Sequence, residues 1–149
     1  MPQYKGFAKL TDKERQTLFQ SMQPRSFAAG HEIITQGALQ GTMYLVVKGE
    51  LKVERHPTTD ADEREYVKAS NAVLIAELGP GQVIGEMSFL DRAPASATVT
   101  ALTDIEVLAI GRAEIEQIRA MDQTFPDRFY QCLAMSLVEK LRATSRRLS

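Results

Sequence analysis

The stretch from Gly85 to Val99, GEMSFLDRAPASATV, constrains the fold more than any other part of the chain. It opens with a glycine and an acid, continues with a short apolar run, is broken by the residues DRAP, and leads into the β-type run ATVTA. This order predicts a loop, one short helical turn, a second loop and a strand. Glycine permits close approach of the backbone, and the unpaired amides of a helix N-terminus attract anions. The spacing would let the small residues around Ser96 surround a phosphate while the Glu86 carboxylate accepts hydrogen bonds from sugar hydroxyls.

This stretch closely resembles the phosphate-binding cassette of cyclic nucleotide-binding domains. The family pattern is roughly G-E-L-A-L, a few variable residues, then P-R-[ST]-A-[TS]-V. The matching residues are Gly85, Glu86, Pro94, Ser96, Ala97, Thr98 and Val99. The resemblance implies a ligand-binding set of Gly85, Glu86, Met87, Ala95, Ser96 and Ala97, with Glu86 in the place of the ribose-binding glutamate. A generic loop–helix–strand corner is the alternative interpretation.

The departure from the family pattern is Ala95, which stands where the family usually has the arginine that pairs with the cyclic phosphate. Removing one partner of such a charge-assisted pair costs about 2–5 kcal/mol. The resemblance therefore implies weak binding of cAMP, cGMP or a related small anion. Arg92, in the preceding loop, is a candidate substitute cation, although a loop arginine is more often solvated.

Composition excludes several other classes of function. The chain has 149 residues and a formal net charge of -1, so no global field attracts nucleic acid or a membrane surface. One cysteine, Cys132, and two histidines exclude an internal disulfide and argue against a metal site. The sequence has no Ser/His/Asp, paired-acid or Walker pattern, so we expect neither an enzyme nor a cofactor. With no long apolar run or signal-peptide core, a cytoplasmic protein is expected.

Short β-type runs dominate the first two thirds of the chain. A capping-box pattern, TDKE, predicts a helix over residues 11–22. From Phe27 onwards the runs HEIIT, TMYLVV and ELKVER alternate with glycines, residues 56–64 read as an exposed loop, and residues 65–78 and 97–110 are strand-like again. This pattern predicts an antiparallel sandwich or barrel. The spacings F-x-x-G-x-x-I and V-x-G-x-L resemble the same family and imply its β-roll, a jelly-roll-like double-stranded β-helix.

The last third of the chain is helical. A short helix is predicted around Ile115–Met121 and a long one from Pro126 to Ser149, a stretch without glycine. Phe129 and Leu133 share a face that could dock on the β-roll, and Cys132 reads as a small core residue. A heptad-like stripe predicts a homodimer through this helix; its members are Tyr130, Ala134, Leu137, Leu141, Thr144 and Leu148.

The segment KLRATSRRLS resembles the RL-x-x-TS segment of catabolite activator-like members of the family. There, a threonine and a serine contact the adenine across the dimer interface, so the resemblance implies ligand contacts for Thr144 and Ser145. Ordinary surface positions on the helix are the alternative. Nothing resembling a helix-turn-helix follows, so we expect no DNA-binding domain and no specific binding of nucleic acid.

Together these patterns predict one cyclic nucleotide-binding-like domain over residues 1–149. Its parts are an N-terminal helical segment (1–25), a β-roll (26–110) that contains the cassette (85–99), and C-terminal helices (111–149). The expected function is a small-molecule sensor that signals through the C-terminal helix. The alternative is an interaction or dimerisation module of the same fold that no longer binds a ligand.

Overall fold

The computed structural model describes residues 7, 9–39, 41–57 and 72–148. The strands are β1 (Gln23–Phe27), β2 (Glu32–Ile34), β3 (Thr42–Lys48), β4 (Leu51–Arg55), β5 (Val73–Leu78), β6 (Val83–Ile84), β7 (Thr98–Ala101) and β8 (Ile105–Gly111). The helices are α1 (Asp12–Ser21), α2 (Glu86–Asp91), α3 (Arg112–Met121) and α4 (Phe125–Leu148). The predicted loop at 56–64 and the first part of the predicted strand region at 65–78 lie largely outside the described residues.

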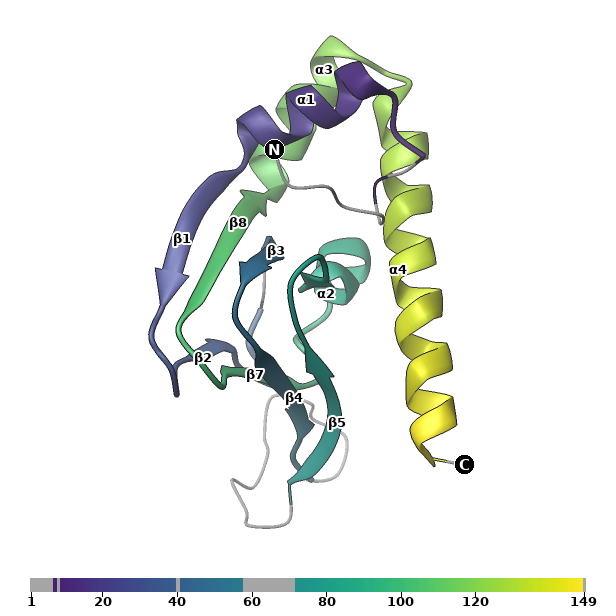
Figure 1. The fold of residues 1–149 in the computed structure, drawn as a ribbon. Helices are drawn as coiled ribbons and strands as arrows, with labels where there is room; N and C mark the ends of the chain where they lie inside the picture. The colour runs from purple at the N-terminus through teal and green to yellow at the C-terminus, as the bar shows by residue number, and fades with distance from the viewer. Residues whose placement is uncertain (1–6, 8, 40, 58–71, 149) are drawn as a thin grey trace.

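The strands form two antiparallel sheets, ordered β1-β8-β3-β6 and β2-β7-β4-β5. Figure 1 shows α1 and α3 together at one end of this β-roll, while α4 runs down its side and passes α2. The expected β-roll with an N-terminal helix and a long C-terminal helix is confirmed. The arrangement places the cassette helix α2 between the sheets and α4 (Figure 1).

The start of α1 agrees with its predicted capping box. Thr11 is the N-cap, its hydroxyl accepts from the Glu14 amide at 3.2 Å, and the Glu14 carboxylate accepts from the Thr11 amide at 2.8 Å. These two bonds satisfy amides that the first helical turn leaves unpaired. The helix ends at Ser21, next to the predicted boundary at residue 22.

Strand β1 corrects the expectation that the β-region begins at residues 26–27. It begins at Gln23 and contains Pro24, and its first four residues are exposed. A proline is tolerated in a strand at the edge of a sheet, where the missing N–H breaks no ladder. Strand β1 is such an edge, because β8 is its one partner among the strands that the structure describes. The sequence signal failed here because an exposed edge strand does not need apolar alternation.

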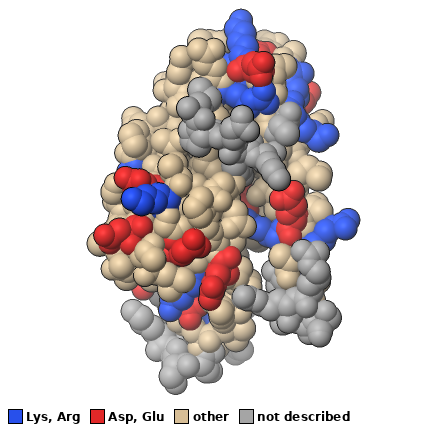
Figure 2. Space-filling model, in the orientation of Figure 1, with Lys and Arg blue, Asp and Glu red and all other residues tan. Residues whose placement is uncertain are grey.

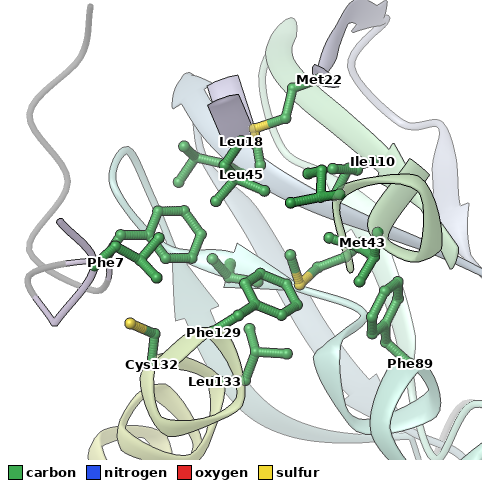
Figure 3. Packing of buried hydrophobic residues seen from close by; sticks show 14 of the residues in the cluster. Phe7, Leu18, Met22, Met43, Leu45, Phe89, Ile110, Phe129, Cys132 and Leu133 are labelled. Atoms are coloured by element: carbon green, nitrogen blue, oxygen red, sulfur yellow. The ribbon is translucent and has the colours of Figure 1, made fainter. Parts of the chain in front are cut away.

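Two hydrophobic clusters hold the fold together. One lies between the two sheets and includes Leu51, Val99 and Ala95. The other joins the helices to the first sheet and includes Met43, Phe89 and residues of α4. In Figure 3, Phe129, Cys132 and Leu133 project from α4 into this cluster, toward Phe7 and Met43. The predicted docking face of the long helix and the core position of Cys132 are confirmed, since these three side chains are 0–1% exposed.

Acidic and basic side chains are interspersed over the face of the molecule that Figure 2 shows. This distribution agrees with a formal net charge of -1. Among the described residues, no helix is both long enough and apolar enough to cross a membrane.

Candidate functional site

The cassette turns from β6 into α2 at Gly85. This residue has a φ of +85° and is the N-cap of α2. A Cβ atom here would meet the Thr42 carbonyl oxygen at 2.8 Å, so both the backbone conformation and the space require glycine. At the other end of α2, Arg92 adopts a φ of 59° and its amide bonds the Ser88 carbonyl at 2.9 Å. The sequence predicted this short helix between two loops, and it is confirmed.

Glu86, the first residue of α2, is an acid buried against α4. Glu86 is 2% exposed, and its Oε1 accepts a hydrogen bond from the Lys140 ammonium, with 2.5 Å between Oε1 and Nζ. Lys140 also donates to the carbonyl oxygen of Val83 in β6. A carboxylate excluded from water needs a charged or hydrogen-bonding partner, and α4 supplies one. The ion pair therefore joins the cassette to the C-terminal helix across 54 residues of sequence.

A second contact joins α2 to α4 through aromatic rings. The rings of Phe89 and Phe129 meet edge to face, with centroids 6.2 Å apart. The Arg112 guanidinium lies over the Phe89 ring, 4.9 Å from its centroid, and its Nη2 donates to the Ser88 carbonyl at 3.4 Å. The Phe89 ring of α2 thus contacts both α4, through Phe129, and α3, through Arg112.

The loop between α2 and β7 is fastened to the β2–β3 connection. The Ala95 amide donates to Ala38 O, and Ala95 O accepts from the Gly37 amide, both at 2.8 Å. Ala95 is 4% exposed and belongs to the cluster between the sheets. The next residue, Ser96, is exposed, and its hydroxyl lies 4.0 Å from the sulfur of Met87. The cassette is therefore a fixed backbone frame with a serine hydroxyl at its surface.

An arginine from another strand reaches this loop. Nη1 of Arg55, the last residue of β4, donates to the carbonyl oxygen of Ser96 at 2.6 Å. The two residues are 41 positions apart in the sequence. The contact brings a positive charge to the residue that follows Ala95.

Helix α4 is anchored near its start by a second ion pair. Two nitrogens of the Arg128 guanidinium donate to the buried carboxylate of Glu14 in α1, with Nε–Oε1 at 2.8 Å and Nη2–Oε2 at 2.7 Å. These hydrogen bonds hold the pKa of the Glu14 carboxyl below its ordinary value. Burial raises the pKa of the Cys132 thiol on the same helix. The helix is thus tied to α1 near one end and to the cassette farther along.

The opposite face of α4 exposes apolar side chains. Tyr130 is 38% exposed, Val138 40% and Leu141 68%, and Ala134 is also exposed. Leu137, another residue of the predicted stripe, is half-buried. The side chains of Thr144 and Leu148 lie outside the described residues. The described part of the predicted stripe is therefore turned mainly away from the β-roll.

The structure brings the predicted cassette residues into one turn-helix-loop unit made of Gly85, Glu86, Met87, Ala95, Ser96 and Ala97. Arg92 is exposed at the C-terminus of α2, and Ser145 is exposed near the end of α4. Sequence reasoning missed two residues that touch this unit, Lys140 and Arg55. Lys140 lies 11 residues after Phe129, three helical turns along the docking face, and this spacing could have revealed it.

Comparison with known proteins agrees with this geometry. Residues 24–122 match the model of the cyclic nucleotide-binding domain family. The CRP-like cAMP-activated global transcriptional regulator of Mycobacterium tuberculosis is 26% identical over 132 residues, which cover 89% of this chain and 53% of that protein. The cyclic AMP receptor protein of Thermus thermophilus is 33% identical over 108 residues, or 72% of this chain and 45% of that protein. The chain thus spans about half the length of these relatives.

The fold is also found among solved structures. A cyclic nucleotide-binding domain from Methylobacillus flagellatus superposes with a TM-score of 0.79 at 22% identity, covering 93% of this chain and 72% of that one. A cAMP-dependent protein kinase regulatory subunit of Schizosaccharomyces pombe is 30% identical over 91 residues, or 60% of this chain and 22% of that protein. The matched family is a ligand-binding domain, and these relatives include a transcriptional regulator and a regulatory subunit, so this domain is regulatory rather than catalytic. On its family match, its β-roll and its cassette, the chain belongs to the cyclic nucleotide-binding domain family.

Proposed function

We propose that the chain is a small-molecule-sensing regulatory module that binds a cyclic nucleotide or a related anion at the cassette and signals through α4. The observation that carries this proposal is the buried pair between Glu86 and Lys140, with 2.5 Å between Oε1 and Nζ. A ligand hydroxyl that donates to Glu86 shares this carboxylate with Lys140 and so alters the geometry of the pair. Because Lys140 belongs to α4, the helix experiences that change directly.

The chemistry of the cassette suits a nucleotide sugar. An ionised carboxylate accepts hydrogen bonds at both oxygens, and Lys140 bonds Oε1, so a ribose hydroxyl can be accepted at Oε2. Gly85, Met87, Ser96 and Ala97 are the other residues of the cassette that would contact the ligand in this proposal. With Ala95 in place of an arginine, we expect weak affinity for cAMP or cGMP, with a Kd of about 10 µM or higher.

A second candidate function is an interaction module that has kept the fold and lost the ligand. Ala95 favours this candidate, because its side chain is 4% exposed and packs among apolar residues of the inter-sheet cluster. In this case the Glu86–Lys140 pair would serve to fasten α4 to the β-roll. The two candidates differ in whether anything binds at Glu86.

The output of the module is proposed to be a homodimer formed through the exposed face of α4, in the cytoplasm. The apolar side chains Tyr130, Val138 and Leu141 on this face support the proposal. In such a dimer, Thr144 and Ser145 of one copy would contact the base of a ligand held by the other. The domain over residues 1–149 would then act as one sensing unit, with α4 as its output element.

Calorimetry with cAMP and with cGMP tests ligand binding. We expect weak binding to the wild type, its loss in Glu86→Gln, and its retention in Glu116→Gln, which removes an exposed acid on α3. Ala95→Arg should strengthen binding at least about tenfold, and Glu86→Ala in that background should remove most of the gain. If neither nucleotide binds the wild type or a folded Ala95→Arg variant at millimolar concentration, binding of cAMP and cGMP is excluded and the interaction module is favoured.

Hydrogen exchange of the α4 amides, with and without cAMP, tests signalling. We expect cAMP to change the exchange of the second half of α4 in the wild type and in Lys140→Arg. The Lys140→Met variant should bind cAMP but show a much smaller change in α4, because the charged link is gone. An equal response in Lys140→Met would contradict the proposed route.

A further inference from the structure

Strands β2 and β4 end on either side of the point where the cassette loop enters β7. Strand β7 lies between them in the second sheet and is antiparallel to both. Ile34 of β2 and Val53 of β4 both pair with Val99, the second residue of β7. The segments that follow β2 and β4 are therefore neighbours of the loop that carries Ser96, although neither segment belongs to the cassette.

Gln36, two residues after β2, joins these two strand ends with its side chain. Gln36 is 2% exposed. Its Nε2 donates to the carbonyl oxygen of His56 at 3.0 Å, and its Oε1 accepts from the His56 amide at 2.8 Å. His56 directly follows β4. A primary amide carries a donor and an acceptor side by side, so this side chain bonds the backbone as a residue of a neighbouring strand would.

The main chain of the same segment holds the cassette loop where it enters β7. The Gln36 amide donates to Thr98 Oγ1 at 3.0 Å, and Thr98 is 3% exposed. The Gly37 amide donates to Ala95 O, and Ala38 O accepts from the Ala95 amide, both at 2.8 Å. The side chain of Gln36 therefore fixes to β4 the same segment that holds the loop on both sides of Ser96.

We infer that Gln36 is a positioning residue for ligand binding, which sets the place of the cassette loop relative to β4. The inference rests on the proposed function, in which the residues around Ser96 receive the ligand. The nitrogen and the oxygen of the Gln36 amide both bond His56, so the side chain acts through the loop. A buried polar network specifies one arrangement when its members are bonded, and it loses that arrangement when a partner is removed. Loss of the Gln36 bonds should therefore lower ligand affinity while the residues that contact the ligand stay the same.

Gln36→Glu tests the side-chain half of this bridge through pH. A protonated carboxyl reproduces the donor and the acceptor of the amide, whereas an ionised carboxylate cannot donate to the His56 carbonyl. In titrations with cAMP, we expect this variant to bind at least about fivefold more weakly than the wild type at pH 8 and about equally at pH 5. Comparison with the wild type at each pH removes the effects of charged groups that both proteins share, namely Glu32, Glu54, Arg55, His56 and Glu86.

Gln82→Glu is the matched control. Gln82 is exposed, and its Oε1 accepts from the Gly79 amide at 2.7 Å, a bond that a carboxylate keeps. The cAMP affinity of this variant should match that of the wild type at both pH values.

Thr98→Val and Thr98→Ser test the main-chain half of the bridge. The valine removes the acceptor of the Gln36 amide and should weaken cAMP binding, whereas the serine keeps a hydroxyl acceptor and should bind like the wild type. Thermal melts at both pH values establish that each variant is folded. If Gln36→Glu does not fold at pH 8, equal affinities of Thr98→Val and Thr98→Ser overturn the inference.

Hydrogen exchange of the Gly37 and Ala95 amides, measured without ligand, reports on the loop itself. Exchange should be faster in Gln36→Glu than in the wild type at pH 8 and equal at pH 5. A folded Gln36→Glu variant that binds cAMP like the wild type at pH 8, or whose loss of affinity persists at pH 5, overturns the inference and leaves the proposed function intact. Failure of cAMP and cGMP to bind the wild type and a folded Ala95→Arg variant excludes these ligands, and the inference with them.

Discussion

At the scale of single residues, Gly85 is a position where a side chain is poorly tolerated. Gly81→Ala and Gly85→Ala form a matched pair, since their φ angles are +86° and +85°. A Cβ at Gly81 meets nothing within 4 Å, whereas one at Gly85 meets the Thr42 carbonyl oxygen at 2.8 Å. We expect Gly81→Ala to lower the free energy of unfolding by about 1 kcal/mol and Gly85→Ala by about 2–4 kcal/mol. Urea denaturation measures both, and equal losses would contradict the predicted clash.

Glu14 gives the fold a predictable dependence on pH. Its pKa is lowered in the folded state, mainly by hydrogen bonds from Arg128, so its stabilising effect is complete above the unfolded pKa, near 4.5. The effect is lost as the pH falls through the lower, folded-state pKa. Glu14→Gln should therefore melt below the wild type at pH 7, and the gap should close under strongly acidic conditions. Thermal melts across pH 2–7 check this; a gap that stays constant with pH would exclude an ionic origin.

At the scale of elements, the docking face of α4 holds the helix on the β-roll. Phe129 is fully buried and its ring contacts those of Phe7, Phe89 and Phe125. Phe129→Ala should destabilise the domain by about 3–5 kcal/mol, because it opens a cavity where α2 and α4 meet. Its exposed neighbour Gln131 is the control, and Gln131→Ala should change stability little. Phe129→Ala should also expose the Cys132 thiol to alkylation, and the rate of alkylation reports whether α4 has moved.

Elements with a local signal could be predicted from the sequence. Each of these signals lies within a few residues of the structure that it predicts. Examples are the capping box at Thr11, the glycine before α2, and the apolar spacing of Phe129 and Leu133. Strand β1 was missed because an exposed edge strand with a proline has no apolar alternation.

The site was predicted less completely than the fold. The cassette residues all lie between Gly85 and Ala97, so a single short pattern identified them together. Lys140 and Arg55 reach the cassette across 54 and 41 residues, and these contacts depend on how the sheets and α4 pack. Single-sequence patterns describe a residue's own element and carry little information about such contacts.

At the scale of the whole molecule, the exposed face of α4 leads us to expect a homodimer. Leu141→Asp, alone or combined with Leu137→Asp, should convert the dimer to a monomer, because a charge in an apolar helix interface is not tolerated. Leu39 is 74% exposed and lies between β2 and β3, so Leu39→Asp is the matched control. Sedimentation at micromolar concentration measures the outcome. A wild type that sediments as a monomer, unchanged by these variants, would exclude this assembly.

The link between Glu86 and Lys140 has a consequence for whatever binds to the outside of α4. Coupling between two sites is a shared free energy, so it acts equally in both directions. Suppose that a ligand at the cassette shifts α4 toward one position and so raises the affinity of a protein that binds α4 in that position. That protein must then raise the affinity of the cassette for the ligand by the same factor. A partner of the helix is then an effector of the cassette, and nucleotide affinity measured on the isolated chain and on its complexes should differ.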